Sequence, residues 1–147
     1  MFKHLLVPTD GSELSADTVQ RAVKFAKEAG AQVTFLFAKP DYPISYFGEG
    51  ALIDPTSPEQ FANMADQQAQ NVLSYCEKMA REAGVAFSSV DFVSDRPYEG
   101  IIAAAENAGA DLIFMASHGR RGVSALLLGS ETQKVLTHST IPVLVYR

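Results

Sequence analysis

Short apolar runs alternate with amphipathic segments along the chain, and this alternation constrains the fold more than any other feature. Runs typical of buried strands occupy residues 5–7, 32–39, 86–93, 112–115 and 141–146. Segments with apolar residues at helical spacing lie between them, at about 13–29, 58–83, 95–108 and 130–138. One helix per crossover is typical of parallel strands, so the sequence predicts a β-α-β-α-β-α-β-α-β order with helices on both faces of a parallel sheet.

Capping residues mark where several of these helices begin and end. Ser12 is a predicted N-cap, and Gly30 is a predicted C-terminal stop for the same helix. Pro58 stands at the first position of the longest helix, where a missing N–H costs nothing. Ser130, followed three residues later by Gln133, fits a capping box and predicts the start of the last helix.

The longest helix carries a predicted core-facing stripe that contains the single cysteine of the chain. The stripe consists of Phe61, Met64, Ala65, Gln68, Val72, Tyr75, Cys76, Met79 and Ala80. One cysteine excludes an internal disulfide. Its place on the stripe favours a buried structural thiol over a reactive one, because reactivity needs exposure and an electropositive setting.

Composition narrows the classes of function. The chain has 147 residues, of which 47% are apolar, and these values fit one ordinary globular domain. A net charge of −5 argues against a general attraction to nucleic acid or to an anionic membrane. No apolar run approaches the roughly 18 residues of a membrane span, and the N-terminal run is too short for a signal peptide. We therefore expect a cytoplasmic protein.

Residues 40–57 follow the second predicted strand and show no regular pattern. They include three aromatic residues, Tyr42, Tyr46 and Phe47, together with several prolines and glycines. Loops of this length in a small domain often serve as lids or partner surfaces. A disordered insertion fits the composition equally well, so both interpretations stay open.

A glycine-rich segment, residues 115–131, joins the fourth strand to the last helix. It contains three glycines and two arginines, and it leads into Ser130 at the predicted helix start. Glycine lets main-chain N–H groups approach a ligand, and a helix N-terminus offers unpaired donors to an anion. In a doubly wound sheet the ligand lies beyond the strand ends where the strand order reverses. The segment therefore predicts a phosphate site, with the turn after the first strand, residues 8–12, beside it.

Several common signatures of phosphate and metal chemistry are absent from the sequence. There is no G-x-x-x-x-G-K-[ST] and no G-x-G-x-x-G after the first strand, which argues against a P-loop and against ordinary dinucleotide binding. There is no cysteine pair, no H-E-x-x-H and no G-x-S-x-G. A dedicated metal site is not expected.

Three stretches together resemble the universal stress protein family. They are the opening Leu6-Val7-Pro8-Thr9-Asp10-Gly11-Ser12, the segment from Met115-Ala116-Ser117-His118-Gly119 through Leu128-Gly129-Ser130, and the closing Ile141-Pro142-Val143-Leu144-Val145. The resemblance covers essentially the whole chain. It implies a single domain, residues 1–147, with a Rossmann-like, doubly wound sheet of five parallel strands in the order 3-2-1-4-5.

The ATP-binding branch of that family carries the pattern G-x2-G-x9-G-[ST]. Gly119, nine residues and then Gly129-Ser130 match its later part, whereas Ala116 occupies the first glycine position. Alanine adds one methyl group, which is tolerable where the local φ is negative and the ligand does not press on Cβ. The resemblance therefore implies an ATP, ADP or AMP site, with Mg²⁺ held only through the phosphates.

The resemblance also implies roles for individual residues in the glycine-rich segment. Gly119, Gly129 and Ser130 would bind phosphate through main-chain N–H groups and the serine hydroxyl, although Gly129-Ser130 could also simply cap a helix. Arg120 is preferred over Arg121 as a phosphate contact. Gly122 is interpreted as a turn residue. The predicted nucleotide-binding set from this segment is Met115, Ala116, His118, Gly119, Arg120, Gly129, Ser130, Glu131 and Thr132.

The ends of the first two strands complete the predicted site. Asp10 would accept a hydrogen bond from a ribose hydroxyl or hold a phosphate-bound metal, whereas a purely local bond to nearby N–H groups is the alternative. Pro8 and Thr9 would shape the adenine wall. Ala38 matches the position whose main chain reads the adenine edge in the family.

The expected function is that of a nucleotide-dependent stress-response regulator, with at most slow hydrolysis. No partner for His118 is evident, so no catalytic residue is predicted. The resemblance implies a homodimer that pairs the last strand, residues 141–146. Two alternatives remain: a nucleotide-free interaction module, which Ala116 would favour, and an adenylate-transferring or nucleotide-hydrolysing enzyme.

Overall fold

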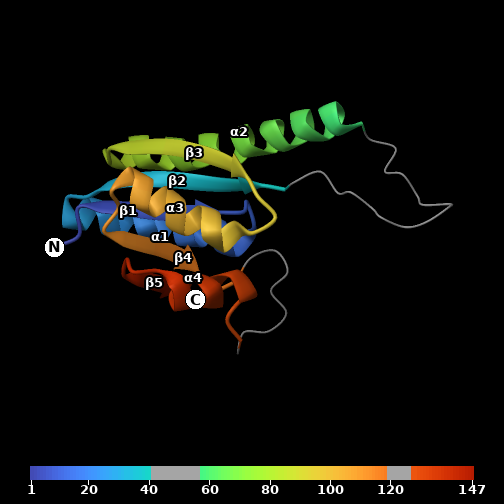
Figure 1. Cartoon of the computed structure of the whole chain (residues 1–147). Coiled ribbons are helices and arrows are strands. Elements are labelled where there is room, and N and C mark those ends of the chain that lie inside the picture. Colours follow the sequence, from blue (N-terminus) through green and yellow to red (C-terminus); the bar gives the residue numbers. More distant parts are fainter. Residues whose placement is uncertain (41–56, 119–126) are drawn as a thin grey trace.

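The computed structural model describes residues 1–40, 57–118 and 127–147. Along the chain it forms β1 (His4–Thr9), α1 (Glu13–Ala29), β2 (Gln32–Lys39), α2 (Pro58–Ala83), β3 (Phe87–Val93), α3 (Pro97–Ala108), β4 (Leu112–Ala116), α4 (Ser130–His138) and β5 (Val143–Tyr146). The predicted alternation of strands and helices is therefore confirmed (Figure 1).

The five strands form one parallel sheet in the order β3-β2-β1-β4-β5, as the family resemblance implied. β1 is central: it pairs with β2 from His4↔Gln32 to Thr9↔Phe37, and with β4 through Leu5↔Leu112 and Leu6↔Ile113. β3 and β5 are the two edge strands. The strand order reverses between β1 and β4, which makes their carboxyl ends the expected ligand position.

Each face of the sheet has its own core. On one face, Val19 of α1 and Leu73 of α2 pack with Val7, Phe35 and other buried residues of the sheet. On the opposite face, the cluster contains Ile101 of α3 and Val135 of α4 with Leu6, Leu36 and Ile113. Successive strand residues point to opposite faces, so Leu6 and Val7 belong to different cores. β1 is consequently buried on both sides.

The predicted helix ends are largely as expected. The Ser12 side chain accepts a hydrogen bond from the Ser15 N–H at 3.2 Å, and Gly30 ends α1 in the left-handed conformation with φ of 65°. α2 begins at Pro58 with a complete capping box between Ser57 and Gln60. Local side-chain chemistry therefore sets these boundaries.

Two of the predicted strands have different limits. β1 does not stop at Pro8 but continues through it to Thr9, with Pro8 in register with Leu36 of β2, whereas the register of β1 with β4 covers only Leu5 and Leu6. β5 begins at Val143, two residues later than the apolar run suggested. Ile141 belongs instead to a turn in which its N–H and C=O both bond the Ser139 hydroxyl.

The predicted stripe of α2 is only partly correct. Cys76 and Ala80 are buried as expected, but Met64 and Tyr75 are 66% and 49% exposed. Ala69 and Leu73, which the stripe omitted, face the core instead. Small side chains at 65, 69, 76 and 80 let the helix lie close to the sheet, so the larger residues are displaced to its flank.

Cys76 is a buried thiol, as the sequence indicated. It is 1% exposed, and burial raises its pKa to about 12. A thiol with such a pKa is protonated at neutral pH and therefore does not react as a nucleophile. In the described part of the chain, no helix is long and apolar enough to cross a membrane.

Gly100 lies where α3 packs against β3, and this contact generates a stability prediction. A Cβ atom at position 100 would lie 1.9 Å and 2.0 Å from two ring carbons of Phe92. Glycine to alanine inside a helix normally stabilises by about 1 kcal/mol, so the sign of the effect is informative. We expect Gly100→Ala to lower the free energy of unfolding by about 1–2 kcal/mol in a urea titration, because the Phe92 ring must move.

The matched background is Phe92→Leu, which shortens the side chain that the new methyl group would meet. In that background Gly100→Ala should be neutral or stabilising, as helix propensity dictates. Equal destabilisation in both backgrounds would contradict the proposed steric cause.

Candidate functional site

The β1–α1 connection is a tight turn stabilised by hydroxyl and carboxylate hydrogen bonds. The Thr9 and Ser15 hydroxyl oxygens lie 2.6 Å apart, and the Gly11 N–H donates to Thr9 Oγ1 at 3.3 Å. Asp10 Oδ1 accepts from the Ser12 N–H at 2.9 Å. Gly11 has a φ of 76°, which favours glycine. The local bond that the sequence left open for Asp10 therefore exists, and it fixes the carboxylate at the carboxyl end of β1.

The β4–α4 connection is closed at its base by main-chain hydrogen bonds. The Ser117 N–H donates to the Tyr146 carbonyl at 2.8 Å, which extends the pairing of β4 with β5. The Gly129 N–H donates to the Ser117 carbonyl at 2.7 Å. The chain thus leaves the sheet after Ser117 and returns to the same point at Gly129. The start of α4 is held directly at the end of β4 (Figure 1).

Gly129, not Ser130, is the N-cap of α4, so the predicted capping box is wrong. Ser130 is the first helical residue, and no side chain caps the helix among the described residues. The Gln133 amide donates to the Leu128 carbonyl at 2.8 Å rather than reaching back to a cap. The first intrahelical bond runs from the Gln133 N–H to the Gly129 carbonyl. The N–H groups of residues 130–132 therefore have no acceptor within the helix.

Close packing explains the glycine at position 129. Its φ of −60° is open to any residue, so the requirement is space and not conformation. A Cβ atom would lie 3.0 Å from His118 Cα and 3.3 Å from the Ser117 carbonyl oxygen. A larger residue would push α4 away from β4. A branched substitution at 129 would therefore disturb the fold and any ligand site together.

Thr132 and Glu131 use their side chains to anchor the first turn of α4. Thr132 is 3% exposed, and its hydroxyl donates to the Ala116 carbonyl at 3.0 Å. Glu131 Oε2 accepts from the Tyr98 N–H of α3 at 2.8 Å. The Thr132 side chain thus points to β4 and the Glu131 side chain to α3. The ligand contacts that the sequence predicted for these two residues would therefore have to use their main-chain N–H groups.

The remaining predicted residues lie near the carboxyl edge of the sheet or outside the described chain. His118 follows β4, and its Nδ1 lies 3.1 Å from Ser117 Oγ. Ala38 is half-buried near the end of β2, in register with Phe92. Met115 is 6% exposed and packs in the α3–α4 core. Pro8 is half-buried in β1. Gly119 and Arg120, with Arg121 and Gly122, lie outside the described residues.

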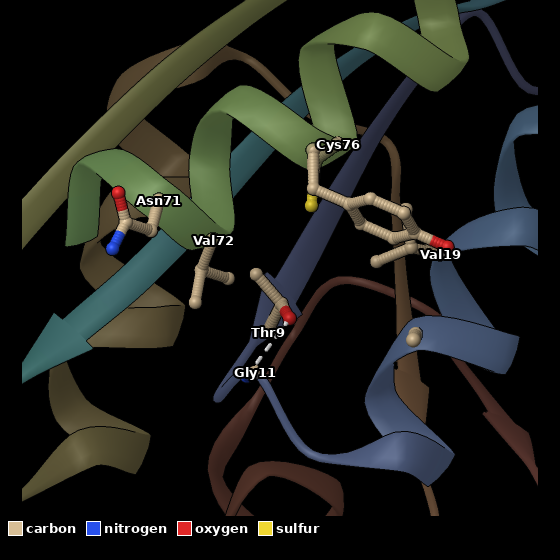
Figure 2. A pocket seen from close by; sticks show the side chains of 8 residues that line it. Thr9, Gly11, Val19, Asn71, Val72 and Cys76 are labelled. Atoms are coloured by element: carbon tan, nitrogen blue, oxygen red, sulfur yellow. Dashed lines mark hydrogen bonds between the residues drawn. The ribbon is translucent and has the colours of Figure 1, made fainter. Parts of the chain in front are cut away.

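A cavity of about 300 Å³ adjoins the β1–α1 turn on the side of α1 and α2 (Figure 2). Its lining is largely apolar and consists of Thr9, Gly11, Ala16, Val19, Asn71, Val72, Tyr75 and Cys76. Sequence reasoning missed the contribution of α2 because it assigned Val72 and Tyr75 to the core stripe. Val72 does pack against the core, as the stripe predicted, and it also lines the cavity together with Tyr75, which is exposed.

Lys39 forms a second feature that the sequence did not reveal. Its ammonium group lies 2.8 Å from Asp66 of α2 and 3.3 Å from Asp91 of β3. The hydrogen bond to Asp66 raises the pKa of Lys39, burial opposes this, and Asp91 adds to the rise. These contacts join three elements at the end of β2. In the part of the chain that the structure describes, no three His, Cys, Asp or Glu side chains are arranged to hold a metal ion.

The strand order defines a doubly wound α/β protein. Its candidate ligand site lies at the carboxyl ends of β1 and β4, between which the strand order reverses. The family model described as "Universal stress protein family" matches residues 1–147. The chain therefore belongs to the universal stress protein family.

Individual relatives agree with this assignment. A universal stress protein of Methanocaldococcus jannaschii is 31% identical over 100% of this chain and 83% of its own. A second universal stress protein from the same archaeon is also 31% identical, over 100% of this chain and 96% of its own. The solved structure of that second protein aligns with a TM-score of 0.81 at 29% identity, over 99% of this chain and 95% of its own. A structure from Lactobacillus plantarum, at 21% identity and a TM-score of 0.77, shows the same fold over 99% and 97% of the two chains.

The buried hydroxyl of Thr132 gives a prediction about the anchoring of α4. Thr132→Val keeps the shape of the side chain but leaves the Ala116 carbonyl without this donor, so we expect a loss of about 1–2 kcal/mol in unfolding free energy. Thr137→Val is the matched control, because the exposed Thr137 hydroxyl bonds only within α4, to the Gln133 carbonyl. Urea titrations should show the control within about 0.5 kcal/mol of the parent. Equal losses in the two variants would contradict an anchoring role for Thr132.

Proposed function

We propose that the protein binds an adenine nucleotide at the carboxyl ends of β1 and β4 and acts as a nucleotide-dependent stress-response regulator, with at most slow hydrolysis. The observation that carries the proposal is the start of α4. Gly129 holds this helix end against Ser117, and the N–H groups of residues 130–132 have no intrahelical acceptor. A helix N-terminus in this state binds phosphate.

The predicted nucleotide contacts follow from this placement. Main-chain donors of Gly129, Ser130 and the next two residues would bind phosphate, with Gly119 and Arg120 contributing from the same loop. Asp10, fixed at the end of β1, would accept a hydrogen bond from the ribose. Pro8, Thr9 and Ala38 would border the base. In this proposal Mg²⁺ arrives with the phosphates of ATP or ADP, and AMP needs none.

Two structural neighbours support the chemical class of the ligand. One is a universal stress protein whose crystal structure was solved in complex with cAMP, and the other is a universal stress protein from Archaeoglobus fulgidus in complex with dAMP. They are 24% and 18% identical to this chain, so the likeness itself is one of fold. An adenine nucleotide is nevertheless a ligand of this fold in both proteins.

Ala116 is the residue on which the alternative function rests, and its conformation favours the proposed one. None of the described non-glycine residues has a positive φ, so Ala116 ends β4 without backbone strain. The substitution of alanine for the family's glycine therefore adds one methyl group and nothing more. A nucleotide-free interaction module would need that methyl group to block the ligand.

A second copy of the chain is the proposed protein partner in either case. β5 lies at the edge of the sheet, and its four residues, Val143–Tyr146, are all half-buried in the single chain. An apolar edge strand has unpaired main-chain groups that another strand can bind. Pairing of β5 with its symmetry mate would produce a homodimer with both nucleotide sites at the strand ends.

Titration calorimetry with ATP, in the presence and absence of Mg²⁺, tests the proposed function. We expect measurable binding by the parent, and about tenfold weaker binding by Asp10→Asn, which removes the charged acceptor but keeps an oxygen for the Ser12 N–H. Asp17→Asn, on the exposed face of α1, is the matched control and should bind as the parent does. Absence of binding by the parent at millimolar ATP would overturn the proposal.

A further inference from the structure

Glu131 caps a helix to which it does not belong. α3 begins at Pro97, and its own N-cap residue, Arg96, makes no side-chain cap hydrogen bond. The Tyr98 N–H, in the first turn of α3, donates instead to Glu131 Oε2 at 2.8 Å. The other oxygen, Oε1, lies 3.4 Å from Lys134 Nζ. A single carboxylate thus joins the first turns of α3 and α4.

Apolar packing also joins the two helices beside this hydrogen bond, because Tyr98 packs against the core cluster that contains Ile101 of α3 and Val135 of α4. Tyr98 of α3 lies beside two residues of α4: Lys134 Nζ is 5.4 Å from its ring centroid, and the ring of His138 is 5.4 Å away. The Tyr98 hydroxyl donates to Glu99 within α3. The hydrogen bond from the Tyr98 main chain to Glu131 adds a charge-assisted contact of defined direction to this packing.

Three contacts consequently fix the orientation of the first turn of α4. Gly129 bonds Ser117 through the main chain, Thr132 bonds Ala116 through its hydroxyl, and Glu131 bonds Tyr98 through its carboxylate. The first two attach the turn to β4, and the third attaches it to α3. Because donors must be held in place to bind an anion well, loss of the third contact should weaken binding at this turn.

Glu131 also brings a negative charge to the same turn. It is the second residue of α4, and its side chain is 35% exposed. A carboxylate suits a helix N-terminus in the absence of a ligand. It repels an anion bound to the same turn, and the repulsion increases with the charge of that anion. Lys134, which is 49% exposed, offsets this only in part.

We propose that Glu131 is a positioning and selectivity residue of the α4 anion site, an inference that rests on the proposed nucleotide function. Its hydrogen bond to Tyr98 orients the donors of the turn. Its charge makes the site favour ligands with little uncompensated phosphate charge, namely a nucleoside monophosphate or a Mg²⁺-bound polyphosphate, over a free polyphosphate.

Two substitutions separate the hydrogen bond from the charge. Glu131→Gln keeps an oxygen that can accept from the Tyr98 N–H but removes the charge, whereas Glu131→Ala removes both. Calorimetry would measure ATP with EDTA, ATP with Mg²⁺, and AMP. For Glu131→Gln we expect affinity for Mg²⁺-free ATP to rise about threefold to tenfold, and affinity for AMP to change less than about twofold. A purely structural role would change the affinities for both ligands by the same factor, and that result would overturn the proposed selectivity.

The comparison of the two variants tests the positioning role. Glu131→Ala should bind all three ligands more weakly than Glu131→Gln, by a similar factor for each, because the same donors are misplaced for each. Equal affinities of the two variants would overturn positioning. Glu106→Gln and Glu106→Ala, on the exposed end of α3, are the controls and should both bind as the parent does.

A measurement without nucleotide keeps this inference distinct from the proposed function. Amide hydrogen exchange at Tyr98 should be slow in the parent and in Glu131→Gln, and clearly faster in Glu131→Ala, because only the last variant lacks the acceptor. Unchanged exchange in Glu131→Ala would overturn the capping contact. If the exchange rates of the three proteins are as expected but the parent binds no nucleotide, the result counts against the proposed function alone.

Discussion

The pairing of β1 with both β2 and β4 is the constraint on which the rest of the structure depends. Leu5, Leu6 and Val7 have no exposed surface, because their side chains enter the two cores and their main chain is hydrogen-bonded on both edges. Chain connections leave β1 toward one face and β4 toward the other. The β1–α1 turn and the two ends of the β4–α4 connection therefore lie at the carboxyl ends of adjacent strands, where the strand order reverses.

Much of this architecture could be predicted from the sequence because it depends on local patterns. Buried parallel strands require continuous apolar runs, and helix ends require particular residues such as Ser57 and Gly84. The face of α2 could not be predicted as well. Its contact with the sheet depends on how closely small residues such as Ala69 approach β2 and β3, and a stripe inferred from helical spacing does not report that distance.

The candidate site shows the same division between local and tertiary information. Asp10 and Ser12 form their turn within a few residues, so the sequence identified both. The bond between Tyr98 and Glu131 spans 33 positions and follows no motif, and only the fold brings the two residues together. Ser130 illustrates the opposite error: its spacing to Gln133 fits a capping box, but Gly129 is the N-cap, because it is extended and its carbonyl accepts the first intrahelical hydrogen bond, from the Gln133 N–H.

The cap at Gly129 also explains how stability and ligand binding can share one helix start. A serine or aspartate cap would satisfy a main-chain donor of α4 with its own side chain and so compete with an anion. Glycine has no side chain that could accept from those donors, and among the described residues the helix start is held by contacts that point elsewhere. Thr132 and Glu131 supply such contacts, to β4 and to α3. The first turn of α4 is thus anchored by side chains that do not accept hydrogen bonds from its own main-chain donors.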